Sequence, residues 1–347
     1  MEVGVGLDGN LDLSFTEEAE LSVEAARLGY TSLWTPEGQG YDSFQVCAHR
    51  WQATREVVSE GLTTGISVSP VALRTPISLA MSAGTLSSMT GGRFILGIGS
   101  GVIYRASGRR TFGLPRLSTL AVMRDYLVTV RALLAGEEVT HESPLFELRN
   151  ASLGIFPPQH TPVYLGALGP WMLRLSGELA DGAALNWCTP EMVAWSRERI
   201  EEGALSAGRD PADVKVAEYI RVCVDSDVAA ARRALATAML GYALGPRRGG
   251  KNLGYRGHFD RMGFAGALTA LDRMRDRGAA VDEMADAVPD ELLGQIGYYG
   301  PAQGAAKALG RISAGLDIAI VRVVPSRPGT EAVLETMRAC RPALIDA

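Results

Sequence analysis

The sequence predicts a (β/α)8 barrel, also called a TIM barrel, for two reasons. Short segments rich in Val, Ile and Leu alternate with amphipathic segments along most of the 347 residues, and this alternation is typical of parallel strands connected by helices. About eight strands are expected, which is the number that closes such a barrel. A doubly wound open sheet ranks lower, because no helix begins at the glycines of VGVGLDGN, residues 3–10, where that fold places its GxGxxG turn.

Each expected strand is a short apolar run, and several are bounded by Gly or Pro. The strands are expected at residues 3–7, 30–35, 61–68, 94–98, 162–167, 183–187, 214–224 and 317–324. The expected helices have an apolar face or are rich in Ala. They are expected at residues 16–28, 42–54, 76–89, 117–135, 171–180, 190–205, 227–242, 302–314 and 330–337.

The chain, residues 1–347, is expected to form one barrel domain with two insertions. Residues 137–160 include HESPLFELRN, which is β-rich, broken by turns and without helical periodicity, so a hairpin-like insertion is expected there. Residues 243–295 are mostly helical. They include GPRRGGKNLG, residues 245–254, which is too rich in Gly and Arg to pack and indicates a lid. A short extra strand is expected at 295–299.

The composition argues against several classes of partner. A net charge of −5 disfavours nucleic acid and anionic membranes, and no run of about 18 apolar residues indicates a membrane span. The first residues, MEVGVGLDGN, enter a strand directly and do not resemble a secretory leader. The cysteines are far apart, without a CxxC pair, and are expected to be reduced thiols of a cytoplasmic protein; they are Cys47, Cys188, Cys223 and Cys340.

Two glycine-bearing turns lie where ligands bind in a barrel, at the carboxyl ends of strands. The first follows the strand in GGRFILGIGSG and contains Gly99 and Gly101; it fits either a ligand close to the backbone or tight packing. The second, Ala167-Leu168-Gly169, precedes Pro170, which is favoured at the first position of a helix. Free N–H groups and the helix dipole make this second turn the better candidate for a phosphate site.

Other motifs give weaker or negative signals. The histidines show no HxH or HExxH spacing, so zinc is not indicated, and no GxSxG elbow suggests a hydrolase. Glu37 follows the second strand at the expected ligand end, where it is either functional or a capping carboxylate. Trp187 ends a strand and is either a core residue or a platform for substrate. The residues alone therefore indicate a barrel enzyme that binds a phosphorylated ligand.

Three longer stretches together resemble the luciferase-like superfamily, in particular its branch that uses the deazaflavin coenzyme F420. They are LGYTSLWTPEGQGYDSF, residues 28–44, the segment 63–101 that ends in RFILGIGSG, and PVYLGALGPWMLRLSGELADGAALNW, residues 162–187. The later segments YRGHFDRMGF and AVPDEL are also similar to this branch. The methylene-tetrahydromethanopterin reductases are the group it resembles most in style. The resemblance implies hydride transfer at C5 of the deazaflavin, a small-molecule substrate and a homodimer.

The resemblance also assigns roles by position. Ser67-Val68 falls where the family has a non-proline cis peptide behind the flavin ring. Glu37 matches an acidic residue beside the cofactor, and Arg105 a polar residue near its tail. Ala167, Leu168 and Gly169 match the turn whose backbone binds the cofactor phosphate, and Gly99 and Gly101 form the floor beside the ring. Arg247, Arg248 and Lys251 could supply a basic groove for the polyglutamate tail.

Two positions depart from family members that oxidise sugar phosphates. Those proteins have a histidine and a glutamate where this chain has Gly38 and Val102, so their acid and base are missing here. A reductase acting on an activated C=C or C=N group is therefore expected, with Gly38, Val102 and Trp187 beside the substrate. Tyr104 and His49 are the candidate proton donors.

Two alternatives remain open. A two-component monooxygenase that uses reduced FMN and oxygen would have the same fold, and a non-catalytic barrel that binds a ligand or partner is also compatible with the sequence. The abundance of Ala, Gly and Arg suits a bacterium with a high-GC genome.

Overall fold

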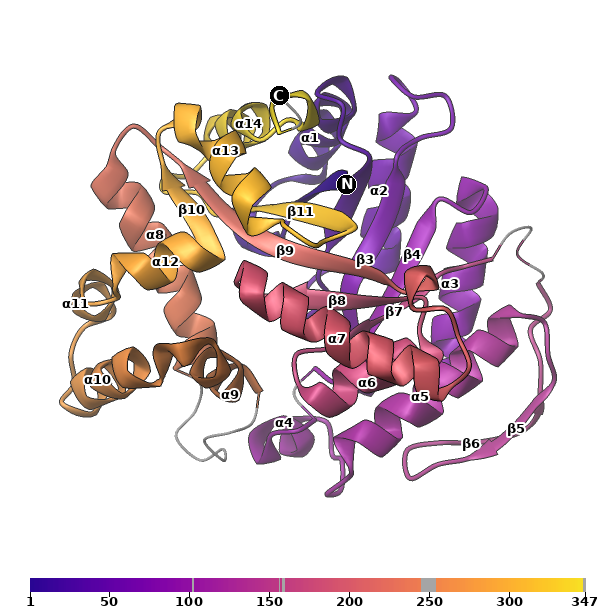
Figure 1. Cartoon of the computed structure of the whole chain (residues 1–347). Helices are drawn as coiled ribbons and strands as arrows, with labels where there is room; N and C mark the ends of the chain where they lie inside the picture. Colours follow the sequence, from indigo (N-terminus) through magenta and orange to yellow (C-terminus); the bar gives the residue numbers. More distant parts are fainter. Residues whose placement is uncertain (102, 156, 158–159, 245–253, 346–347) are drawn as a thin grey trace.

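A closed barrel of eight parallel strands forms the centre of the protein (Figure 1). The computed structural model describes residues 1–101, 103–155, 157, 160–244 and 254–345. The barrel strands are β1 (Glu2–Gly6), β2 (Ser32–Thr35), β3 (Thr63–Pro70), β4 (Phe94–Gly99), β7 (Val163–Gly166), β8 (Gly182–Asn186), β9 (Lys215–Val224) and β11 (Ile318–Val323). The order β9-β11-β1-β2-β3-β4-β7-β8 closes by pairing of β8 with β9, which confirms the predicted fold.

The longest strand also carries the extra strand that the sequence predicted. β9 pairs with β11 along one edge, and its other edge pairs first with β8 and then with β10 (Gly297–Gly300). Residues 221–224 of β9 lie opposite β10. β10 therefore continues the edge of β9 beyond the end of β8.

Helices cover the outside of the barrel. They are α1 (Phe15–Arg27), α2 (Ser43–Thr54), α3 (Pro76–Thr90), α5 (Thr119–Leu134), α6 (Pro170–Leu179), α7 (Pro190–Ser206), α8 (Val228–Ala243), α13 (Ala302–Ile312) and α14 (Thr330–Ala339). Side chains of Ser, Thr or Asp cap the N-termini of α1, α2, α3, α5, α7 and α8, which explains why these helices begin where they do. None of the described helices is long and apolar enough to cross a membrane.

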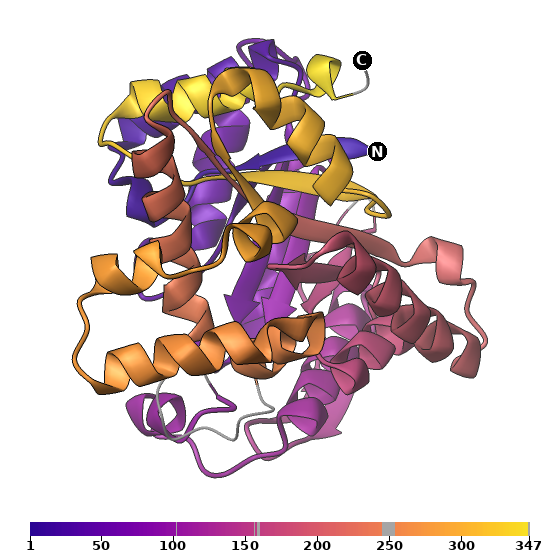
Figure 2. The same cartoon turned by 60° about the vertical axis from the view of Figure 1, so that its left-hand side comes forward.

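Insertions lie at two sides of the barrel. β5 (Val139–Glu142) and β6 (Glu147–Ala151) form an antiparallel ribbon at the lower right of Figure 1. The second insertion contains α9 (Gly254–Phe259), a π-helical turn at Asp260–Phe264, α10 (Ala265–Asp276), α11 (Val281–Asp286) and α12 (Asp290–Ile296). The short helix α4 (Ala106–Thr111) was not predicted, because ASGRRT has no apolar periodicity. Figures 1 and 2 place α4 beside α9 and α10 at one end of the barrel.

The interior of the barrel changes character along the strands. Its apolar layer contains Trp34, Tyr164, Ala217, Tyr219, Ile318 and Ile320. Because alternate residues of a strand face the same side, the interior row of β9 runs Ala217, Tyr219, Arg221 and that of β11 runs Ile318, Ile320, Arg322. Both rows therefore turn from apolar to charged toward the carboxyl ends of the strands.

Two glycines allow α6 and α7 to pack with backbones in contact. A Cβ atom at Gly177 would lie 1.9 Å from the carbonyl oxygen of Ile200, and one at Gly203 would lie 1.9 Å from that of Arg174. Neither oxygen belongs to a flexible side chain, so the two helices would have to separate. This contact fixes the position of α6, whose N-terminus follows the Ala167–Gly169 turn.

We expect Gly177→Ala to lower the free energy of unfolding by roughly 1–3 kcal/mol, the usual effect of inserting a methyl group into a full interface. Urea unfolding measures this change. Gly266→Ala on α10 is the matched control, since a Cβ there meets nothing within 4 Å and a helical Gly-to-Ala change is neutral or stabilising. Equal stabilities of the two variants would contradict the prediction.

Candidate active site

A cavity of about 610 Å³ opens at the carboxyl ends of the strands. One side is formed by residues that follow or end β2, β3 and β4, including Glu37, Gly38, Ser67, Val68, Gly101, Tyr104 and Arg105. The other side is formed from β8, β9, β11, α8 and α9 and includes Asn186, Tyr219, Tyr242, Tyr255 and Arg322. β3 and β9 are four strands apart in either direction around the barrel, so these two sides face each other.

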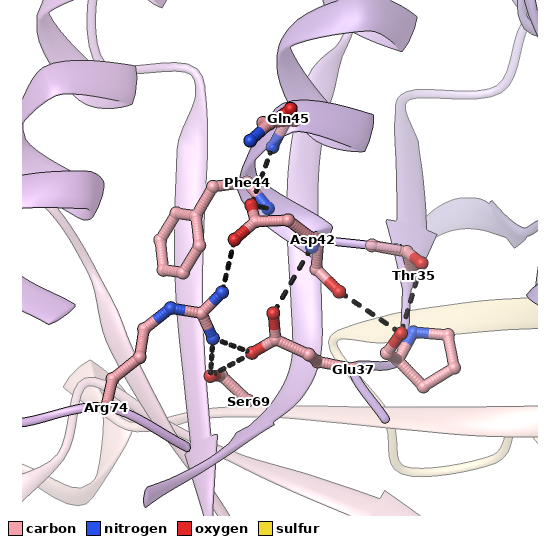
Figure 3. Close-up of polar contacts among 9 residues, drawn as sticks. Thr35, Glu37, Asp42, Phe44, Gln45, Ser69 and Arg74 are labelled. Carbon is pink, nitrogen blue, oxygen red and sulfur yellow. Dashed lines mark hydrogen bonds and ion pairs between the residues drawn. The ribbon is translucent and has the colours of Figure 1, made fainter. Parts of the chain in front are cut away.

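Glu37 is the centre of a buried polar network between β2, α2 and the segment after β3 (Figure 3). Its Oε2 accepts hydrogen bonds from the hydroxyl of Ser69 and from Arg74, and its Oε1 accepts one from the backbone N–H of Ser43 at 3.2 Å. Arg74 also donates to Asp42. Burial opposes the charge of Arg74, but the hydrogen bonds and charges of Glu37 and Asp42 outweigh it and raise the pKa of the guanidinium.

The same region contains the peptide bond between Ser67 and Val68, which is cis, at the position that the family resemblance implied. The backbone N–H of Glu37 donates to the carbonyl of Val68 at 3.3 Å. A Cβ atom at Gly99 would lie 2.4 Å from a methyl carbon of Val68, and one at Gly97 would lie 3.2 Å from the other. The glycines of strand β4 thus make room for Val68, while Gly101 lies farther along and lines the cavity.

The predicted site residues fall into three groups. Gly38, Tyr104 and Arg105 line the cavity, and the Arg105 guanidinium carbon lies 5.0 Å from the Tyr104 ring centroid. His49 does not line it; its ring nitrogen Nε2 contacts the carbonyl oxygen of Phe15 at 2.8 Å. Val102 lies outside the described residues, as do the basic residues proposed for the cofactor tail, Arg247, Arg248 and Lys251.

Trp187 is fully buried and does not line the cavity. Its ring lies 4.1 Å from the guanidinium carbon of Arg221 and packs against Tyr242 and Phe259. A substrate platform must be open to the ligand, so the structure places Trp187 in a supporting position behind the wall.

The Ala167–Gly169 turn leads into α6, which has no side-chain cap at its N-terminus. A Cβ atom at Gly169 would meet no atom within 4 Å, so its backbone is open to approach. The exposed Arg261 donates to the carbonyl of Leu168 at 2.9 Å, which places a positive charge beside this helix start. The turn does not line the large cavity.

A buried thiol and imidazole lie near this turn but are not arranged for catalysis. Nε2 of His258 lies 2.9 Å from the carbonyl oxygen of Trp187 and 3.7 Å from the sulfur of Cys188. Burial lowers the pKa of His258 to about 4 and raises that of the Cys188 thiol well above its ordinary value. Both groups are therefore uncharged at neutral pH, and a thiolate nucleophile is disfavoured.

The residues missed at the sequence level lie mainly on the β9/β11 side of the cavity. Arg322 donates to the hydroxyl of Tyr242 at 3.0 Å and forms an ion pair with Asp8. Asn186 donates to the hydroxyl of Tyr255. The available signal was a single arginine within each of the apolar strand sequences RVCV and IAIVRV, since a charge inside such a strand needs a partner or a function.

Removing the charge of Glu37 tests whether its network holds the cavity wall together. We expect Glu37→Gln to lower the free energy of unfolding by roughly 3 kcal/mol, because it leaves the Arg74 guanidinium without the negative charge of its buried partner. The Glu37 side chain is 2% exposed and that of Arg74 is 14% exposed. Glu20→Gln, at an exposed site on α1, should change stability by less than about 0.5 kcal/mol. Similar urea-unfolding curves for both variants would rule out this role.

Comparison with known proteins relates this geometry to a family. The family model described as Luciferase-like monooxygenase matches residues 2–317. The 5,10-methylenetetrahydromethanopterin reductase of Methanolobus tindarius is 31% identical over 57% of this chain and 62% of its own length. A Mycobacterium tuberculosis protein named "Putative coenzyme F420-dependent oxidoreductase" is 30% identical over 79% of this chain and 81% of its own length.

The reductase of Archaeoglobus fulgidus with the same name as the Methanolobus protein matches over 47% of its length. The chain thus matches less than two thirds of both reductases. Among solved structures, the coenzyme F420-dependent tetrahydromethanopterin reductase of Methanopyrus kandleri has a TM-score of 0.78 and 21% identity, covering 99% of each chain. Monooxygenase RslO1 of Streptomyces bottropensis has a TM-score of 0.70 and 19% identity, covering 100% of each chain. These structures share the fold, and the family model spans the barrel from β1 to residue 317, directly before β11. The chain therefore belongs to the luciferase-like monooxygenase family of oxidoreductases.

Proposed function

We propose that this protein is a coenzyme F420-dependent reductase that transfers a hydride between C5 of the deazaflavin and a small organic substrate. The observation that carries the proposal is an open, uncapped helix start after β7, at the same carboxyl end of the barrel as the large cavity. Of two relatives at about 30% identity, one is named as a putative coenzyme F420-dependent oxidoreductase and the other as a 5,10-methylenetetrahydromethanopterin reductase. When bound, the deazaflavin would supply or accept the hydride.

The start of α6 suits a phosphate group. The first N–H groups of a helix have no partner within the helix, and the helix dipole favours negative charge there. Gly169 leaves space for a ligand to approach the backbone, and Arg261 adds a cation beside Leu168. The residues Ala167, Leu168 and Gly169 would therefore hold the cofactor phosphate.

The β3 side of the cavity suits a flat ring. Val68 and Pro70 present apolar surface, and the absence of a side chain at Gly101 lets its backbone pack against Pro70. The network of Glu37 with Ser69 and Arg74 fixes this wall. Its role is to hold the wall rigid, so that the cofactor and the substrate are positioned for hydride transfer.

Tyr104 is the proposed proton donor. Its side chain lines the cavity, whereas His49 points to the backbone of Phe15, so the proton role falls to the tyrosine. Gly38 lines the cavity, and by the family resemblance it stands where sugar-phosphate dehydrogenases have a histidine. This position supports reduction of a C=C or C=N group over oxidation of an alcohol.

Substitution of Gly169 tests cofactor binding without damage to the fold. Gly169→Asp should cap α6 and leave stability unchanged or a few tenths of a kcal/mol higher. Its carboxylate should repel the cofactor phosphate and weaken F420 binding by at least about tenfold. Gly169→Asn is the matched control, since it caps the helix without charge. Fluorescence titration with F420 gives the dissociation constants.

The wild-type protein should also be titrated with FMN. Tight FMN binding without F420 binding, together with oxygen-dependent turnover of reduced FMN, would replace the proposal with a two-component monooxygenase. Absence of stabilisation by either cofactor would favour a non-catalytic barrel, since a ligand at 100 times its dissociation constant adds about 2.7 kcal/mol.

A homodimer stays a prediction, and the family resemblance implies that its interface involves the helices of the second and third βα units, α2 and α3. Met81 and Met89 on α3 are 54% and 53% exposed. Sedimentation equilibrium would measure the association state.

A further inference from the structure

Two arginines lie side by side inside the barrel at its carboxyl end. Arg221 of β9 and Arg322 of β11 are register partners in the parallel ladder, so both side chains project from the same face of the sheet. Arg221 is 1% exposed, and Arg322 lines the cavity. Each positive charge makes burial of the other less favourable, and negative charge nearby offsets this cost.

The described residues supply only one nearby carboxylate for these two cations. Asp8 forms an ion pair with Arg322, while Arg221 forms hydrogen bonds to neutral oxygens of Asn186 and Tyr219. Burial and the charge of Arg322 lower the pKa of Arg221 to about 10, so it stays charged at neutral pH.

The carboxyl group nearest in sequence to Arg221 does not compensate it. Glu218 projects from the opposite face of β9 and accepts a hydrogen bond from the backbone N–H of Cys188 at 2.6 Å. Burial raises the pKa of Glu218 to about 8, so it is largely uncharged at neutral pH. The interior cluster therefore has an excess of one positive charge.

Hydrogen-bonding groups of this cluster are also left without partners. Among the described residues, Nη2 of Arg221 and the hydroxyl of Tyr219 are buried and make no hydrogen bond. Arg322 and Tyr242 line the cavity. Arg322 uses two of its five N–H donors for its contacts with Asp8 and Tyr242. A planar anion at this point would meet donors that already converge.

We propose that this cluster binds a carboxylate group of the substrate, so that the protein acts on a small organic carboxylate. Arg322 and Tyr242 would contact the carboxylate directly, and Arg221 would stabilise its charge from behind. A guanidinium matches the planar geometry of a carboxylate. That this group belongs to the substrate of a hydride transfer rests on the proposed function.

The opposite side of the cavity supports the same orientation. There Glu37 and Asp42 are paired with Arg74, and Arg105 also lines this side, so two carboxylates and two guanidinium groups balance each other. A carboxylate is therefore attracted more strongly to the β9/β11 side, where the cluster has an excess of one positive charge. The remainder of the substrate would then extend toward Ser67 and Val68, where the ring of the cofactor is proposed to lie.

The test compares carboxylates with neutral amides of the same shape. Wild-type protein is titrated calorimetrically with benzoate and benzamide, cinnamate and cinnamamide, and 1-naphthoate and 1-naphthamide. We expect at least one carboxylate to bind at least tenfold more tightly than its amide. If no pair shows this preference, the proposal is wrong.

Two variants locate the binding group. Tyr242→Phe removes one hydroxyl, and the double variant Asp8→Asn with Arg322→Gln removes the guanidinium without leaving Asp8 as an unpaired charge. Each should reduce the carboxylate preference to less than threefold. Tyr298→Phe is the matched control, since its hydroxyl donates to the carbonyl of Pro301 outside the cavity, and it should retain the full preference.

A spectroscopic measurement checks the contact independently of affinity. The titratable groups around the Tyr242 hydroxyl are Arg322, Arg221, Tyr255 and Asp8. Burial opposes ionisation of Tyr242, but the two arginine charges outweigh it and lower the pKa of this phenol. A bound carboxylate should raise that pKa, seen as a shift in the 295 nm titration of wild type that Tyr242→Phe lacks. A titration that is unchanged at saturating carboxylate would contradict the proposal.

F420 titrations separate this inference from the proposed function. If the variants weaken F420 binding and not carboxylate binding, the cluster serves the cofactor and the inference is overturned. If carboxylates bind preferentially but F420 does not bind, the proposed function fails and the carboxylate site stands.

Discussion

Closure of the barrel by pairing of β8 with β9 is the constraint on which the site depends. Because all eight strands are parallel, closure gathers their carboxyl ends around one opening. It also places β3 opposite β9 and β4 opposite β11. The Glu37 network and the arginine cluster come from distant parts of the chain, yet they face each other across a single cavity.

The two sides of the cavity differ in net charge. On the β3 side, Glu37 and Asp42 are balanced by Arg74 and Arg105, and on the β9/β11 side the two guanidinium groups have one carboxylate nearby, Asp8, among the described residues. Within a buried barrel such a difference acts more strongly than it would in water, because the surrounding protein screens charge poorly. A substrate with a negative end and an apolar body would be oriented by this difference before any chemistry occurs.

Glycines serve different purposes in β4 and at the start of α6. In β4, Gly97 and Gly99 accommodate the side chain of Val68, so their absence of a side chain serves packing. At Gly169 no protein atom occupies the space that a side chain would take, so packing does not explain this glycine. The sequence left a ligand or tight packing open at the first turn and favoured a phosphate at the second, and only the three-dimensional neighbours distinguish the two turns.

The sequence by itself determined the order of strands and helices, the barrel and the antiparallel insertion, because these depend on local periodicity, turns and caps. It also identified Glu37, Gly101 and Tyr104 as residues near the carboxyl ends of strands, where the fold alone places a site. It could not place His49 or Trp187, since the face of a helix or strand end that meets the cavity depends on packing. Only the tertiary structure brought Arg221 and Arg322 together, because their pairing follows from the register of two strands about 100 residues apart in the chain.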